Sequence, residues 1–134
     1  MKANELRLRN YIQIMDGSGH DCQPTEITSI KENSVGISCK IFNLSLGTYY
    51  QLEDLEPIPL TEEWLLKLGF KKNGEEYSIT MMSLVFVIQP PKPMGEWQTF
   101  YSWIYDTFKF SVIKYVHELQ NLYFALSGEE LEIK

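Results

Sequence analysis

The two histidines and two cysteines of this 134-residue chain, His20, Cys22, Cys39 and His117, belong to the residue types that bind zinc. Structural zinc sites usually supply close ligand pairs such as Cys-x2-Cys, and here only His20 and Cys22 are close, beside a glycine-rich turn. The spacing therefore argues against a metal site and favours a loop histidine with two buried thiols. We also find no motif for a cofactor, and we expect none.

Residues 16–21, Asp-Gly-Ser-Gly-His-Asp, contain the residue types of a nucleophilic relay. Such a relay has to be held by rigid elements, whereas two glycines predict the tip of a hairpin. The strand–elbow–helix context of a G-x-S-x-G motif is also missing. Glu62/Glu63, Glu75/Glu76 and Glu129/Glu130 are pairs of carboxylates that are neighbours in the sequence, and neighbours point apart on a helix or strand. No residue pattern therefore predicts catalysis, and we expect a protein that is not an enzyme.

The most informative stretch is residues 115–126, which has the apolar spacing of an amphipathic helix and ends at Ser127-Gly128. His117, Gln120, Asn121 and Phe124 fall together on the flank of this helix. An aromatic ring among amide and imidazole groups is unusual for a solvated face, so these four residues are a candidate interaction surface. The alternative is a helix covered on two sides, whose polar flank satisfies backbone groups of its own chain.

A second candidate surface is the aromatic strand predicted over residues 98–104. Trp97, Tyr101 and Trp103 share one face of this strand, and Phe100 lies on the other. Both faces are thus aromatic or apolar. Either the strand is central and covered on both sides, or one face is an interaction surface, including one for a second copy of the chain.

Composition narrows the classes of partner. The formal net charge is −6, from 12 basic and 18 acidic residues, which argues against binding to a phosphate backbone. No apolar run approaches the roughly 20 residues that span a bilayer, and no apolar segment of a signal peptide follows the N-terminus. We therefore expect a cytoplasmic protein that does not enter a membrane, with its cysteines reduced.

The predicted fold is α+β, in a single domain over residues 1–134. Short strands at roughly ten-residue spacing predict a small SH3-like β-barrel in the first half, residues 5–56. A short capped helix and an antiparallel sheet packed on the C-terminal helix are predicted for the second half, residues 57–134. Thr61 is the expected N-cap of the short helix, and Gly69 is its expected left-handed end.

Four segments carry a family resemblance: residues 2–7 (KANELR), 55–65 (LEPIPLTEEWL), 69–70 (GF) and 115–131 (YVHELQNLYFALSGEEL). Together they resemble a family of short uncharacterised proteins from phages and prophages of Bacteroidota-type bacteria. The resemblance covers the two ends and the middle of the chain, and it implies a phage setting without an activity.

The leading expectation is a binding module for a protein or a small ligand, with the helix flank and the aromatic strand as its contact surfaces. The alternatives are a nucleic-acid-associated accessory protein that uses the barrel-like half, and an enzyme acting on a small substrate. The latter would need a pocket in which His117 has a carboxylate within hydrogen-bonding distance.

Overall fold

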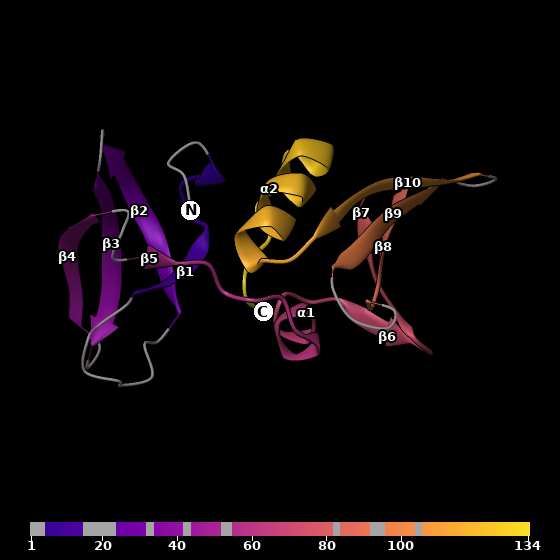
Figure 1. Ribbon diagram of the computed structural model, residues 1–134, viewed down its shortest axis with the longest axis horizontal. Helices are drawn as coiled ribbons and strands as arrows, with labels where there is room; N and C mark the ends of the chain where they lie inside the picture. Colours follow the sequence, from indigo (N-terminus) through magenta and orange to yellow (C-terminus); the bar gives the residue numbers. More distant parts are fainter. Residues whose placement is uncertain are drawn as a thin grey trace. The chain divides into compact units, whose positions relative to one another are not determined.

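The computed structural model describes residues 5–14, 24–31, 34–41, 44–51, 55–81, 84–91, 96–103 and 106–134. The chain divides into two compact units, each with its own sheet (Figure 1). Unit 1 comprises Met1–Ile58 and Tyr115–Leu122, and unit 2 comprises Pro59–Lys114 and Tyr123–Lys134. Two antiparallel sheets and a C-terminal helix confirm the α+β class.

The sheet of unit 1 has the strand order β4-β3-β2-β1-β5, and each neighbouring pair is antiparallel. Its strands are β1 (Tyr11–Ile14), β2 (Thr25–Lys31), β3 (Ser34–Ile41), β4 (Leu44–Gln51) and β5 (Leu55–Glu56). Among the described residues, no pairing joins the edge strands β4 and β5 into a closed barrel. The core cluster consists of Leu6, Ile12, Ile27, Val35 and Leu55, with Ile14 packed against it.

A turn at residues 7–10 leads into β1. Arg9 adopts a left-handed conformation (φ 71°), which reverses the chain. The side-chain oxygen of Asn10 accepts a hydrogen bond from the Arg7 N–H at 2.8 Å. Ile27 of β2 fixes the turn from the other side, since its carbonyl accepts from the Arg9 N–H and its N–H donates to the Asn10 carbonyl.

The short helix α1 (Glu62–Lys67) in unit 2 begins and ends as its sequence predicts. Thr61 is the N-cap, and its hydroxyl accepts a hydrogen bond from the Trp64 N–H. At the other end, Gly69 has a φ of +91°, and the Phe70 N–H donates to the Leu65 carbonyl. Together with the bond from the Gly69 N–H to the Leu66 carbonyl, this is a Schellman motif.

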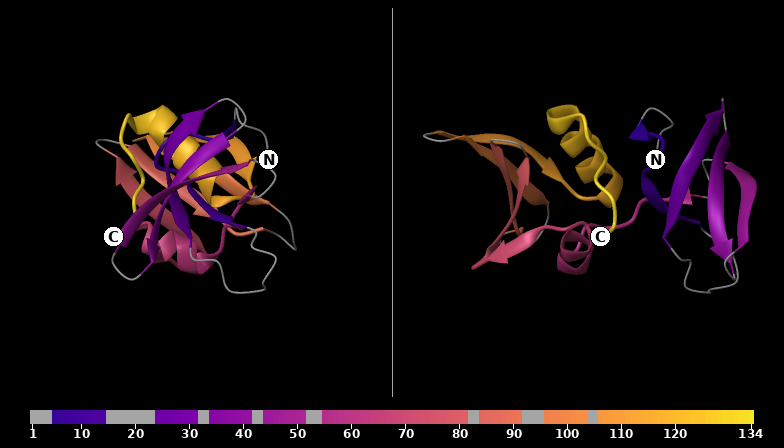
Figure 2. Two further views of the ribbon diagram at one scale, coloured as in Figure 1. Left: turned by 90° about the vertical axis from the view of Figure 1, so that its left-hand side faces the viewer. Right: turned by 180° about the vertical axis from the view of Figure 1, so that it is seen from behind.

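The sheet of unit 2 is a five-stranded meander in the order β10-β9-β8-β7-β6. Its strands are β6 (Lys71–Asn73), β7 (Glu76–Met81), β8 (Leu84–Gln89), β9 (Trp97–Trp103) and β10 (Asp106–Ile113). The two-residue turn from β6 to β7 needs a positive φ at its first position, and Gly74 supplies one at 64°. Helix α1 lies on one side of this sheet (Figure 2). Buried on that side are Trp64, Leu65, Phe70, Tyr77, Phe86 and Ile88.

The C-terminal helix α2 (Val116–Ser127) supplies residues to both units, with the division after Leu122. The carboxylate of Glu118 accepts a hydrogen bond from the Tyr115 N–H at 3.1 Å and so caps the first turn. Residues 129–134 form no strand. Leu131 is buried instead, and the Lys134 N–H donates to the Lys67 carbonyl. No helix of the described residues is long and apolar enough to cross a membrane.

Candidate functional site

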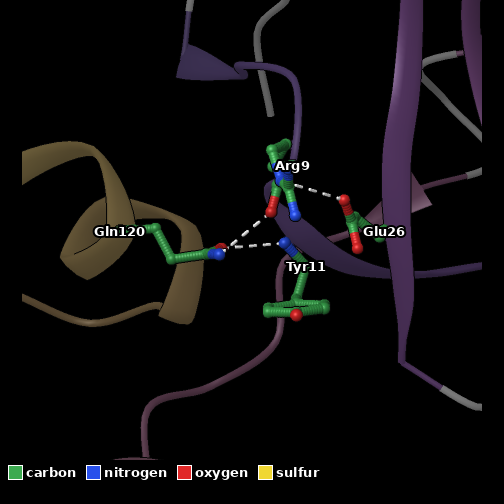
Figure 3. A network of polar contacts seen from close by, with 4 residues as sticks. All are labelled: Arg9, Tyr11, Glu26 and Gln120. Carbon is green, nitrogen blue, oxygen red and sulfur yellow. Dashed lines mark hydrogen bonds and ion pairs between the residues drawn. The ribbon is translucent and has the colours of Figure 1, made fainter. Parts of the chain in front are cut away.

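Gln120 of helix α2 binds the chain's own N-terminal segment (Figure 3). Its side-chain oxygen Oε1 accepts a hydrogen bond from the Tyr11 N–H at 2.8 Å, and its Nε2 donates to the Arg9 carbonyl at 3.0 Å. The Gln120 side chain is only 1% exposed. Arg9 in turn forms an ion pair with Glu26 of β2, at 3.3 Å. One amide group therefore satisfies two backbone groups at the entrance to β1.

Asn121 continues this contact one residue further along the helix. Its Nδ2 donates to the Glu5 carbonyl at 2.8 Å, and its Oδ1 accepts from the Asn10 side chain at 3.0 Å. Asn121 is half-buried, whereas Asn10 is fully buried. Two neighbouring amides of α2 thus hold the segment that runs from Glu5 to Tyr11.

His117 is 2% exposed and lies parallel to the Tyr115 ring, with centroids 5.9 Å apart and 10° between the planes. Its Nδ1 has no hydrogen-bond partner within the described part of the chain. Burial lowers the pKa of His117, because a cation loses hydration there. The carboxylates of Glu118 and Glu5 partly offset this shift, and the α-amino group adds to it. A buried neutral imidazole does not suit proton transfer with solvent.

The remaining predicted residues lie elsewhere. Phe124 is half-buried and belongs to unit 2, so the flank predicted from the helix is shared between the units. Trp97 is anchored within unit 2, where its indole N–H donates to the Leu60 carbonyl at 2.9 Å and its ring meets that of Tyr77 edge-on at 5.8 Å. Tyr101 and Trp103 lie in β9, but their side chains fall outside the described residues.

Two sites considered from the sequence depend on residues that the structure does not describe. Residues 16–21, with His20, and Cys22 lie outside the described ranges, as does the side chain of Cys39 in β3. Within those ranges, no group of three or more His, Cys, Asp or Glu residues is placed to hold a metal ion.

A small charged cluster stands at the start of α1. Lys72 Nζ lies 2.8 Å from Glu62 Oε1 and 5.6 Å from the centre of the Tyr77 ring. The hydrogen bond from Lys72 lowers the pKa of the Glu62 carboxyl, so this carboxylate is ionised at neutral pH. The Lys–Glu pair is about half exposed and connects β6 to α1. This contact between two elements of the same unit is a structural role for the pair.

The two faces of the unit 2 sheet differ in burial. The register pairs Tyr77 with Ile88, and Ile88 with Thr99, and all three are buried. The register also pairs Val87 with Phe100, on the opposite face, and both of these are only half-buried. One face is therefore the core of the unit, and the other is largely open to solvent.

We call this second surface the open face. By the register it contains Lys71, Asn73, Glu76, Ser78, Thr80, Val85, Val87, Gln89, Gln98, Phe100, Lys109 and Val112. Val85, Val87 and Phe100 form its apolar centre on the two inner strands β8 and β9, and Val112 on the edge strand β10 is 45% exposed. A contiguous apolar area with a polar rim is typical of a binding surface.

Comparisons of the chain with protein-family models, with curated proteins and with solved structures found no match. Of the open face, the sequence indicated only Phe100, as the apolar side opposite Trp97. The uninterrupted apolar run of residues 84–88 was the available signal, because a strand with one solvated face normally alternates.

Proposed function

We propose that the protein is a non-enzymatic binding module, and that the open face of unit 2 is its contact surface for a protein partner. The half-buried apolar centre formed by Val85, Val87 and Phe100 carries this proposal. The helix flank supports it less, because Gln120 and Asn121 already bind the backbone of the N-terminal segment.

We further propose an SH3-like arrangement for unit 1. A meander of four strands, followed by a short fifth strand that returns to pair with the first, supports this assignment. The SH3-like arrangement would leave β4 and β5 at the ends of the order β4-β3-β2-β1-β5.

The phage or prophage origin and the cytoplasmic location are also part of this proposal. Residues 55–65 and 115–131, which carry most of the family resemblance, form β5, α1 with its cap, and α2. The segments that carry the resemblance are therefore structural elements of both units, as expected for a family whose members share a fold.

Capture of partners from phage-infected cells by the wild-type chain and by variants tests the proposed surface. A Val87→Thr/Phe100→Thr variant removes apolar area and keeps residues that favour strands. A partner captured by the wild type should be lost with this variant. Leu66→Ser is the matched control, because Leu66 is 48% exposed on α1 of the same unit. Partners that bind both variants equally well would contradict the proposal.

A further inference from the structure

The open face has a row of residues that crosses all five strands of unit 2. Lys71 of β6 is paired with Ser78, Ser78 with Val87, Val87 with Phe100, and Phe100 with Lys109 of β10. The row therefore has an apolar centre and a lysine at each end. Four strand spacings of about 4.8 Å separate the two lysine backbones by roughly 19 Å.

The two terminal lysines differ from other lysines of the same unit. Lys67, Lys72 and Lys114 each have a glutamate carboxylate within 2.8 Å. Lys71 and Lys109 are exposed, and neither has an ion pair with any described residue. Both ammonium groups are thus available to a partner that brings its own carboxylates.

The distance between the two lysines sets the length of the segment that such a partner would place between them. An extended peptide advances about 3.3 Å per residue, so roughly six residues reach from one lysine to the other. Apolar side chains between the two acids would cover Val87 and Phe100. Ser78 lies within this row, where its hydroxyl accepts a hydrogen bond from the Asn73 amide, and Gln98 offers a polar group beside the row.

A single-stranded nucleic acid also carries anionic groups, but it fits the open face less well. Such ligands are bound by several aromatic rings that stack successive bases within a strongly basic groove. Among the described side chains of this face, Phe100 is the one aromatic ring. The chain's net charge of −6 also repels a polyanion.

We propose that the open face binds an extended peptide segment of a protein partner, with an apolar centre and acidic residues about six positions apart. This inference rests on the proposed function and adds the chemistry of the partner. It predicts that the two lysines select the ends of the peptide, and that Phe100 and Val87 bind its centre.

A random-peptide display selection against the full chain, read by sequencing, tests this inference. The enriched peptides should have apolar centres with Asp or Glu on both sides. A Lys71→Glu/Lys109→Glu variant should instead enrich peptides with Lys or Arg at those positions. A synthetic peptide from the wild-type selection should bind this variant at least tenfold more weakly. Lys67→Glu/Lys114→Glu is the matched control, since it makes the same charge change outside the row and should retain binding.

The other outcomes separate the two proposals. Peptides that need Phe100 but show no acidic preference would overturn the acidic partner and leave the binding surface in place. If no enriched peptide depends on Val87 or Phe100, both proposals fail. A twelve-nucleotide oligothymidine and a twelve-nucleotide oligouridine serve as direct probes of the rival ligand. Binding of either one that is lost with Phe100→Thr would overturn the peptide assignment.

Discussion

Replacing Gln120 by alanine should destabilise unit 1 far more than a typical change on a helix surface does. The substitution removes the hydrogen bonds from the Gln120 side chain to the Tyr11 N–H and to the Arg9 carbonyl. Because Gln120 is 1% exposed, water can replace the lost amide only if the site opens. Two backbone groups at the start of β1 would then lose the hydrogen bonds that Gln120 makes to them.

The size of the effect follows from these two bonds. A typical hydrogen bond contributes about 1 kcal/mol net, and each buried group left without a partner costs about 1–3 kcal/mol. We therefore expect Gln120→Ala to lower the free energy of unfolding by about 2–4 kcal/mol. This is a large part of the roughly 5–15 kcal/mol that stabilises a typical domain.

Two further variants make the reasoning specific. Gln120→Glu keeps the acceptor for the Tyr11 N–H, so it should still protect the Tyr11 amide from exchange. It should nevertheless lower the free energy of unfolding, because the second carboxylate oxygen is an acceptor that faces the Arg9 carbonyl. Asn121→Ala also removes two bonds, but its site is half-buried and water can reach it. Its cost should be about 1 kcal/mol or less.

Urea unfolding gives the free energies, and amide hydrogen exchange followed by NMR gives the protection of the single Tyr11 amide. Exchange at Tyr11 should speed up in Gln120→Ala and stay slow in Gln120→Glu. A loss below about 0.5 kcal/mol, with unchanged protection of Tyr11, would refute the role of Gln120 as a clamp on the N-terminal segment.

Three other predictions concern single residues. The folded state keeps His117 neutral at a lowered pKa, so stability should be full above the unfolded pKa of 6.5 and fall as the pH drops below it. Urea unfolding between pH 7 and 5.5 should show this slope, at most about 1.4 kcal/mol per pH unit, and His117→Gln should abolish it. Gly69→Ala should lower stability by about 1–2 kcal/mol, because φ is +91° and the new Cβ would lie 3.0 Å from the Lys134 side chain. Gly74→Ala should cost less, since nothing lies within 4 Å of its Cβ position, and equal losses in thermal melts would contradict this difference. Trp97→Phe should cost about 1 kcal/mol in guanidinium unfolding through the lost bond to the Leu60 carbonyl, and an unchanged midpoint would argue against that bond.

The sequence predicted those elements whose signals are local. Helix α1 is specified by the Thr61 cap and by Gly69, and both act within one turn of the helix. Residues 84–89 form β8, because a run of β-branched and aromatic residues favours a strand. Strands β5 and β6 have two and three residues, too few for any periodic pattern. They form because longer strands already offer them an edge to pair with.

The candidate residues show the same difference between local signals and long-range contacts. The sequence marked His117, Gln120, Asn121 and Phe124 as unusual for a solvated helix face, but it could not identify their partners. Tyr11 lies 109 positions from Gln120, and Glu5 lies 116 positions from Asn121. No local pattern encodes a contact over such separations. For the same reason, the pairing that places Lys71 and Lys109 at the ends of one row could be seen only once the register of four strand pairs was known.

The two candidate surfaces differ in whether folding itself accounts for their composition. On helix α2, the amides of Gln120 and Asn121 satisfy backbone and side-chain groups of the N-terminal segment, so a partner is not needed to explain them. On the open face, Val87 and Phe100 gain only partial burial, and polar residues at these positions would keep the sheet soluble at little cost in stability. An adjacent apolar pair on the two inner strands, framed by lysines that have no ion pair with a described residue, therefore supports the proposed binding surface.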